Sequence, residues 1–116
     1  MKRTVNRGDI FYADLPVFEN SEITHGRRPI VIVSNDKNNT ENTYIQYVPL
    51  TKNIDKEKLP THKRILCDDL DGESLALCEG LGVLPIKKLR NKVASIAPEW
   101  MKEIEKGIKI QIGLDE

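Results

Sequence analysis

Gly26-Arg27-Arg28-Pro29 runs directly into the apolar segment Ile30-Val31-Ile32-Val33. A continuous β-branched run of this kind is typical of a strand that is covered on both faces. We therefore predict a buried strand over residues 30–33, with the guanidinium groups of Arg27 and Arg28 just before its start. An arginine is always charged, and its planar fork matches the geometry of a phosphate group. The stretch thus indicates a β fold and a contact with a phosphodiester.

Other short strand patterns surround this stretch on both sides. Turn residues such as Asp71-Gly72 separate them and favour tight connections. The expected strands cover residues 10–15, 30–33, 43–50, 61–67, 74–78, 81–84 and 93–96. Between them we expect a loop over residues 17–28, a turn over 35–39, and a loop or short turn over 52–58.

Only the end of the chain has a strong helical pattern. Pro98 suits the first position of a helix, and Gly107 weakens that helix because glycine costs about 1 kcal/mol relative to alanine. The apolar residues at helical spacing are Trp100, Met101, Ile104, Ile108 and Ile112, and we expect Trp100 to pack rather than to stack on bases. Many short strands followed by one helix predict a mainly β fold, a small, partly open β-barrel with a C-terminal helix packed on it.

The composition limits the class of protein. The chain has 116 residues, which predicts a single domain over 1–116. Its 18 basic and 18 acidic residues cancel, which argues against a protein that coats nucleic acid by bulk charge but allows a local basic groove. No segment is apolar enough to cross a membrane or to resemble a signal peptide, so we expect a cytoplasmic protein. Cys67 and Cys78 match no zinc pattern and are expected to be buried, inert thiols.

Five polar residues are candidates for chemistry, namely Ser21, Glu22, His25, Arg28 and Thr51. Thr51 follows the expected strand 43–50, so pairing of that strand with the arginine strand would bring a hydroxyl and a guanidinium to one rim. The chain lacks a metal-ligand pattern and a phosphate-binding glycine loop. RNA needs neither, because its own 2′-hydroxyl can attack the neighbouring phosphate. Arg28 would then stabilise the developing charge, Thr51 would bind a phosphate oxygen, and Glu22 or His25 would act as the base.

Each of these residues also has a structural interpretation. Arg28 is equally suited to an ion pair with an acidic neighbour, and Arg27 to a surface charge or a contact with an RNA backbone. Thr51 taken alone is typical of a strand-end hydroxyl, and Ser21 of a residue that organises its own loop. His62 lies beside Lys63 and Arg64, and we expect it on the surface of a strand rather than at a catalytic site.

An ordered series of motifs over most of the chain resembles the MazF/PemK toxins of bacterial toxin–antitoxin systems. The series begins with Gly8-Asp9-Ile10-Phe11-Tyr12-Ala13-Asp14-Leu15, then Ser21-Glu22, and then Gly26-Arg27-Arg28-Pro29. It continues with Val48-Pro49-Leu50-Thr51, Leu59-Pro60-Thr61-His62, Leu75-Ala76-Leu77-Cys78-Glu79 and Lys87-Lys88-Leu89. Any one motif is weak, but the ordered set is specific.

The resemblance implies a small SH3-like (CcdB/PemK-like) barrel that forms a homodimer. It also implies a metal-independent, sequence-specific endoribonuclease that needs no cofactor, cuts single-stranded RNA, and leaves a 2′,3′-cyclic phosphate and a 5′-hydroxyl. A cognate antitoxin is expected to block the groove with a peptide that folds on binding. The implied catalytic residues are Arg28, Thr51 and Glu22, and the implied substrate-binding residues are Ser21, His25, Arg27, Lys52 and Glu79.

The chain departs from the family pattern at several positions that bear on base recognition and the cut site. Asn20 replaces a glycine, Ile23 replaces a glutamine, and the loop has an extra residue around Thr24-His25. Gly80 stands where glutamine is usual, and Gly82 where an arginine or lysine is usual. Two alternatives therefore stay open. One is a CcdB-like toxin that binds DNA gyrase and cleaves nothing, and the other is a degenerate member that only binds an antitoxin.

Overall fold

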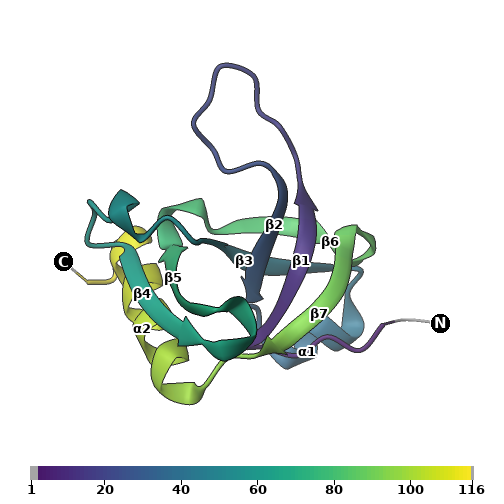
Figure 1. Cartoon of the computed structure of the whole chain (residues 1–116). Coiled ribbons are helices and arrows are strands. Elements are labelled where there is room, and N and C mark those ends of the chain that lie inside the picture. The colour runs from purple at the N-terminus through teal and green to yellow at the C-terminus, as the bar shows by residue number, and fades with distance from the viewer. Residues whose placement is uncertain (1–2, 116) are drawn as a thin grey trace.

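The strand β3 (Tyr44–Thr51) organises the computed structural model, which describes residues 3–115. The first half of β3 pairs with β6 (Gly82–Pro85), its middle pairs with β2 (Gly26–Ile32), and its end pairs with β5 (Gly72–Leu77), all antiparallel. One strand therefore belongs to two sheets, and the sheet curls around it (Figure 1).

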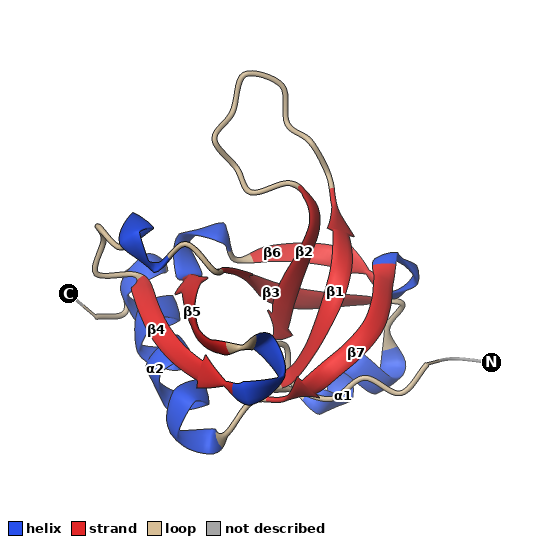
Figure 2. Ribbon diagram, in the orientation of Figure 1, coloured by secondary structure: helices blue, strands red, loops and turns tan. Residues whose placement is uncertain are grey.

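The other strands extend the sheet on both sides of β3. β1 (Asp9–Leu15) pairs with β2 and with β7 (Leu89–Ser95), and β4 (His62–Cys67) pairs with β5. The resulting order is β4-β5-β3-β2-β1-β7, with β6 added to β3. β4 and β7 lie at the two ends of this order, so the barrel is open, as Figure 2 shows. The predicted mainly β fold with a C-terminal helix is confirmed.

The helix α2 (Pro98–Gln111) covers one end of the barrel and packs on β4 and on the 3₁₀ turn Cys78–Gly80. Its buried face includes Gly107, and a Cβ atom there would lie 2.5 Å from the Sγ of Cys78. The glycine that weakens the helical pattern is therefore the residue that lets the helix approach the barrel closely.

Two apolar clusters fill the interior. One lies under α2 and is formed by the helix and by residues of β1 to β5, and the other lies between β1, β2, β3 and β6. Ile30, Val31 and Ile32 are each 0% exposed, and they divide between the two clusters. The prediction of a strand covered on both faces is confirmed for Ile30 to Ile32, but β2 begins at Gly26 and ends at Ile32. The expected loop over residues 17–28 is therefore wrong for residues 26–28, and Val33 lies just after the strand.

Several local expectations need correction. Residues 35–39 do not form a simple turn, because Asp36–Glu41 forms a short helix, α1, whose N-cap Asn35 accepts a hydrogen bond from the Asn38 amide. The last strand begins at Leu89 rather than at residue 93. The segment 52–58 contains one 3₁₀ turn, Ile54–Lys56. The Asp71-Gly72 turn is present, with positive φ at both residues.

Within residues 3–115, no helix is long and apolar enough to cross a membrane. The basic start of the chain, which the compartment prediction used, includes residues 1 and 2, and these lie outside the described residues together with residue 116. Cys67 and Cys78 are both buried free thiols. Burial, helped by the nearby Glu79 carboxylate, raises the pKa of the Cys78 thiol to about 12, so this thiol is inert.

Candidate functional site

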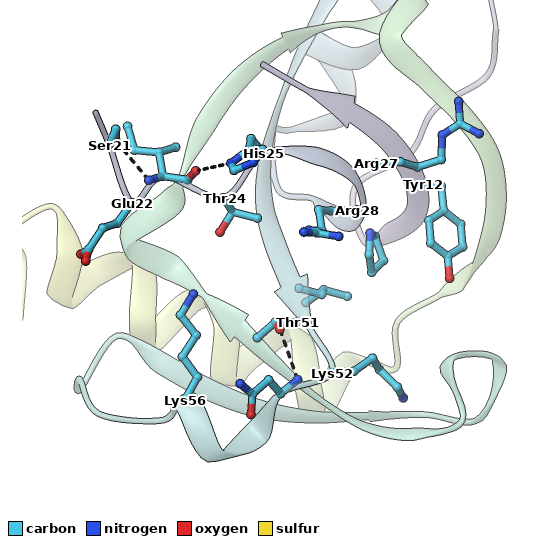
Figure 3. Close-up of a pocket in the computed structure, with 14 residues that line it drawn as sticks. Tyr12, Ser21, Glu22, Thr24, His25, Arg27, Arg28, Thr51, Lys52 and Lys56 are labelled. Atoms are coloured by element: carbon cyan, nitrogen blue, oxygen red, sulfur yellow. Dashed lines mark hydrogen bonds between the residues drawn. The ribbon is translucent and has the colours of Figure 1, made fainter. Parts of the chain in front are cut away.

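Arg28 on β2 and Thr51 at the end of β3 lie just beyond the paired part of these two strands. The last pair of the two strands is Ile30 with Pro49. Arg28 on β2 and Thr51 on β3 each lie two residues beyond that pair. Both side chains line a hollow of about 570 Å³ at this rim of the barrel (Figure 3). The expectation that a hydroxyl and a guanidinium lie at one rim of the barrel is therefore confirmed.

Arg28 is exposed in this hollow and has no hydrogen-bond or ion-pair partner among residues 3–115. Its structural alternative, an ion pair with an acidic neighbour, is absent from the described part of the chain. The Thr51 Oγ1 accepts a hydrogen bond of 3.2 Å from the Asn53 amide. Because that bond uses only a lone pair, the Thr51 hydroxyl hydrogen remains free to donate to a ligand.

Arg27 forms the ion pair instead. Antiparallel pairing sets Arg27 opposite Asp14 on β1, and the Arg27 Nε donates to the Asp14 Oδ1 at 3.0 Å. Arg90 donates to the other carboxylate oxygen at 2.6 Å. Hydrogen bonds from Arg90 and Arg27 lower the pKa of Asp14 below its ordinary range. Successive strand residues point to opposite faces, and Figure 3 shows Arg27 turned away from Arg28, at the edge of the hollow.

The long loop between β1 and β2 projects from the barrel (Figure 1). Its residues 21–25 line the hollow. The Ser21 Oγ accepts a hydrogen bond from the Ile23 amide at 3.1 Å, so Ser21 organises this loop as well as lining the site. The His25 Nδ1 lies 3.3 Å from the Ile23 carbonyl oxygen. Glu22 lines the hollow and has no side-chain partner among the described residues. Asn20, which replaces a glycine of the family pattern, has φ 58, a conformation that asparagine tolerates.

Lys52 and Lys56 line the hollow but differ in whether protein groups bind their ammonium groups. The Lys52 ammonium donates to the carbonyl oxygens of Leu70 and Glu73, so backbone groups hold it although the residue lines the hollow. Lys56 has no side-chain partner within residues 3–115, and Figure 3 shows its ammonium pointing into the hollow. The sequence reasoning missed Lys56, because a lysine in a charged segment carries no signal that distinguishes a site residue from a solvated one.

A second hollow of about 650 Å³ adjoins the first and shares four loop residues and Lys56 with it. Its other lining residues are Lys58, Leu59, His62, Leu77, Glu79 and Gly80. The Glu79 carboxylate accepts a hydrogen bond from the Thr61 Oγ1 at 3.0 Å, and its other oxygen lies 2.6 Å from the His62 Nε2. His62 is 6% exposed, so the expectation of a surface histidine is wrong. The two hollows form one groove from Arg28 to Glu79.

The two glycines that depart from the family pattern each allow a close approach. A Cβ atom on Gly80 would lie 2.8 Å from the Pro49 ring, and one on Gly82 would lie 2.9 Å from the Tyr47 hydroxyl. Tyr47 is 8% exposed, and burial raises the pKa of its hydroxyl. In this chain, Pro49 and Tyr47 therefore fill the space that a glutamine or a basic residue at positions 80 and 82 would need.

Among the residues described, no cluster of three His, Cys, Asp or Glu side chains is placed to bind a metal ion. The hollow around Arg28 and Thr51 offers a different kind of site. It combines an unpaired guanidinium, a free hydroxyl, an unpaired carboxylate and a free ammonium. Such a set can bind a phosphate, donate hydrogen bonds to its oxygens and accept a proton.

The barrel and its groove have the fold of the solved MazF toxins. The structure of MazF from Deinococcus radiodurans matches with a TM-score of 0.80 at 17% identity, over 97% of this chain and 99% of that one. A mycobacterial endoribonuclease solved in complex with its cognate antitoxin matches with a TM-score of 0.79 at 21% identity, over 97% and 98%. At these identities the likeness concerns the fold.

The sequence comparisons define the family. The profile of the PemK-like, MazF-like toxins of type II toxin–antitoxin systems matches residues 6–112. The Endoribonuclease MazF of Staphylococcus saprophyticus is 35% identical over 112 residues, which cover 95% of this chain and 92% of that protein. The chain therefore belongs to the PemK-like, MazF-like toxin family, and the resemblance seen in the sequence motifs is confirmed.

Proposed function

We propose that this chain is an endoribonuclease toxin that cuts single-stranded RNA at specific sequences, without a metal ion, through the RNA's own 2′-hydroxyl. Family membership and the 35% identical Endoribonuclease MazF support the general activity. The single observation that carries the mechanism is the unpaired Arg28 guanidinium that lines one open hollow together with the free Thr51 hydroxyl.

The reaction divides into bond changes that the groove residues can assist. The 2′-oxygen of the RNA forms a bond to the adjacent phosphorus while Glu22 accepts the 2′-hydroxyl proton, or His25 does so in its place. Arg28 binds the non-bridging oxygens, whose charge grows in the transition state, and the Thr51 hydroxyl donates to one of them. The bond from phosphorus to the 5′-oxygen then breaks, and that oxygen takes up a proton. The products are a 2′,3′-cyclic phosphate and a 5′-hydroxyl.

The rest of the groove binds the strand. Ser21, His25, Arg27 and Lys52 line the first hollow, and Glu79 lines the second. We assign contacts with the RNA backbone to Arg27 and Lys52 and contacts with bases to Ser21, His25 and Glu79. The chain acts as a cytoplasmic homodimer, and a cognate antitoxin inhibits it by laying a peptide in the groove. The antitoxin complex of the mycobacterial relative supports this last point.

The decisive experiment incubates the purified protein with a long single-stranded RNA in EDTA and maps the cuts and the chemistry of the new ends. We expect discrete cuts with cyclic phosphate ends from the wild type, and nearly none from Arg28→Ala. Full activity of Arg28→Ala, or a requirement for added metal, would contradict the mechanism. A wild-type protein that cuts nothing would instead favour a CcdB-like toxin that binds DNA gyrase or a degenerate member that only binds an antitoxin.

A further inference from the structure

The buried imidazole of His62 has a defined hydrogen-bonding pattern. Its Nδ1 lies 3.0 Å from the backbone nitrogen of Lys58 and 3.4 Å from that of Leu59. A backbone N–H can only donate, so Nδ1 acts as the acceptor and carries no proton. The proton of the ring is therefore on Nε2. One side of the ring fixes the turn before β4, and the other side is left as a hydrogen-bond donor.

This donor is directed at Glu79. The His62 Nε2 lies 2.6 Å from the Glu79 Oε2, and the Thr61 Oγ1 donates to the Oε1 at 3.0 Å. Each carboxylate oxygen thus has one donor from the start of β4. An ionised carboxylate has about four acceptor sites in all, so each oxygen keeps capacity for another donor. Glu79 lines the second hollow, and its side chain is 33% exposed.

We propose that His62 is a positioning residue that holds the Glu79 carboxylate as a fixed pair of acceptors, and that this pair reads a base of the bound RNA. The proposal rests on the proposed endoribonuclease function. His62 is only 6% exposed, so little of its own ring is accessible to a bound base. His62 therefore contributes to base specificity by fixing the orientation of the Glu79 carboxylate.

The chemistry of the pair defines the class of base. Two carboxylate oxygens accept hydrogen bonds and donate none, so they match a base edge that carries N–H donors. Guanine presents a ring N–H beside an amino group, and adenine and cytosine each present one amino group. Uracil presents its single ring N–H between two carbonyl oxygens, which a carboxylate repels. The site therefore selects a base with an amino group over uracil, by about 10- to 100-fold if the contact is as strong as typical paired base contacts.

Two substitutions at position 62 separate the two roles of the imidazole. The amide oxygen of His62→Asn takes the place of Nδ1, so this variant retains the acceptor for the turn and loses the donor to Glu79. The amide nitrogen of His62→Gln takes the place of Nε2, so this variant retains the donor and loses the acceptor. Glu79→Gln is a third variant, which replaces one acceptor oxygen of the pair by a donor and leaves His62 unchanged.

The test cleaves an RNA library with randomised positions and sequences the new ends, with thermal unfolding of each variant as a check of folding. We expect the wild type to prefer an amino-bearing base at one position. His62→Asn should lose about tenfold or more of that preference, His62→Gln should retain most of it, and Glu79→Gln should shift it toward bases that offer an acceptor beside a donor.

Several results would overturn the proposal. These are an unchanged base preference in Glu79→Gln, equal effects of the two His62 variants, or a larger loss in His62→Gln than in His62→Asn. If His62→Asn does not fold, the Glu79→Gln result decides. These outcomes leave the proposed function intact as long as the wild type cuts RNA and Arg28→Ala does not. A wild type that cuts no RNA would contradict both the proposed function and this further proposal.

Discussion

The two ends of the groove differ in how their charged groups are held. At the Arg28 end, the guanidinium, the Glu22 carboxylate and the Lys56 ammonium have no side-chain partner within residues 3–115. At the Glu79 end, the carboxylate has two partners and the imidazole of His62 has three. The Arg28, Glu22 and Lys56 charges are thus left open, whereas the Glu79 carboxylate and the His62 imidazole are fixed by protein partners before any ligand arrives.

This difference fits the roles proposed for the two ends, phosphate chemistry at Arg28 and base recognition at Glu79. A group that stabilises a charge developing on phosphate gains most when no protein partner competes for it. A group that tells one base from another gains most when its orientation is fixed in advance, because a loose acceptor adapts to several bases. With the proposed function, the groove therefore combines an open reacting end with a pre-organised reading end.

The open end is tested most strongly by comparing Arg28→Ala with Arg27→Ala. Arg28→Ala should lower the rate of RNA cleavage by about 100- to 1,000-fold, because it removes the guanidinium aimed at the phosphate. Arg27→Ala should mainly weaken binding and reduce the salt dependence of log K by about 0.7, the value for one contact with a single strand. Single-turnover cleavage rates and binding titrations at several salt concentrations measure the two effects.

Equal losses of rate in the two variants would contradict the division of roles between these neighbours. The matched pair is informative because both substitutions remove one positive charge from the same strand, β2. Bulk electrostatics therefore changes equally in both. The position of the lost guanidinium differs, and only Arg27→Ala also breaks an ion pair with Asp14.

Thr51→Val should lower the cleavage rate by about 10- to 100-fold, since it removes a hydrogen bond to a charged group worth about 1.5–3 kcal/mol. The loss should appear in the rate of the bound complex rather than in RNA affinity, if the hydroxyl contacts the phosphate mainly in the transition state. Thr24→Val is the control, because Thr24 lines the same hollow and has no side-chain partner among residues 3–115. A similar loss in Thr24→Val would show that the hollow responds to any loss of a hydroxyl.

The fixed end depends on the close packing of α2, which Gly107→Ala tests. The added Cβ would lie 2.5 Å from the Cys78 Sγ and 3.1 Å from the Thr61 carbonyl oxygen. We expect a loss of about 1–3 kcal/mol in the free energy of unfolding, because overpacking outweighs the gain in helix propensity of about 1 kcal/mol. Chemical denaturation measures it. The preference for the base read by Glu79 should also relax, since Thr61 and Cys78 are direct chain neighbours of His62 and Glu79.

A double-mutant cycle with Cys78→Ala gives the matched control for Gly107→Ala. Removing the Sγ relieves the nearest contact, so Gly107→Ala should cost less in the Cys78→Ala background. Equal costs in both backgrounds would show that the helix propensity or the Thr61 contact decides the effect instead.

The open end was largely predictable from the sequence. At the fixed end, the family resemblance implied Glu79 as a substrate-binding residue, but its pairing with His62 was not predictable. The β-branched run after Pro29 predicts a buried strand, and the two residues Arg28 and Thr51 at strand ends indicate a phosphate site. These are local signals. The role of each arginine was open, because Arg27 and Arg28 look alike until the register with β1 sets Asp14 opposite Arg27.

The Glu79 end depends on contacts between residues 17 positions apart in the chain, such as His62 with Glu79. Beside Lys63 and Arg64, His62 looks like a surface residue. In the structure it is buried and is bonded to the backbone of Lys58 and Leu59 and to Glu79. Gly107 likewise looks like a weakness of the helix until its distance to Cys78 is known. Motifs on one strand can be recognised from the chain alone, whereas pairs formed by tertiary packing cannot.

Asp14→Asn is expected to have the smallest effect, and the size of this effect depends on pH. The pKa of Asp14 is lowered by its hydrogen bonds with Arg90 and Arg27. A carboxyl whose pKa is lower in the folded state stabilises the fold above its ordinary pKa of about 3.9, and this contribution is lost as the pH falls through the lowered value. The wild type should therefore unfold at a slightly higher temperature than Asp14→Asn near neutral pH, and the difference should vanish in strong acid.

Thermal unfolding of both proteins at about pH 7 and at about pH 2.5, at low and high salt, measures this difference. A gap that persists in acid would show that Asp14 acts through packing rather than through its charge. The same variant also extends the comparison between the two ends. Asp14→Asn releases Arg27 from its ion pair, so the open end gains a second unpaired guanidinium. RNA binding should then tighten slightly, and the salt dependence of binding should steepen, while the base read by Glu79 stays the same.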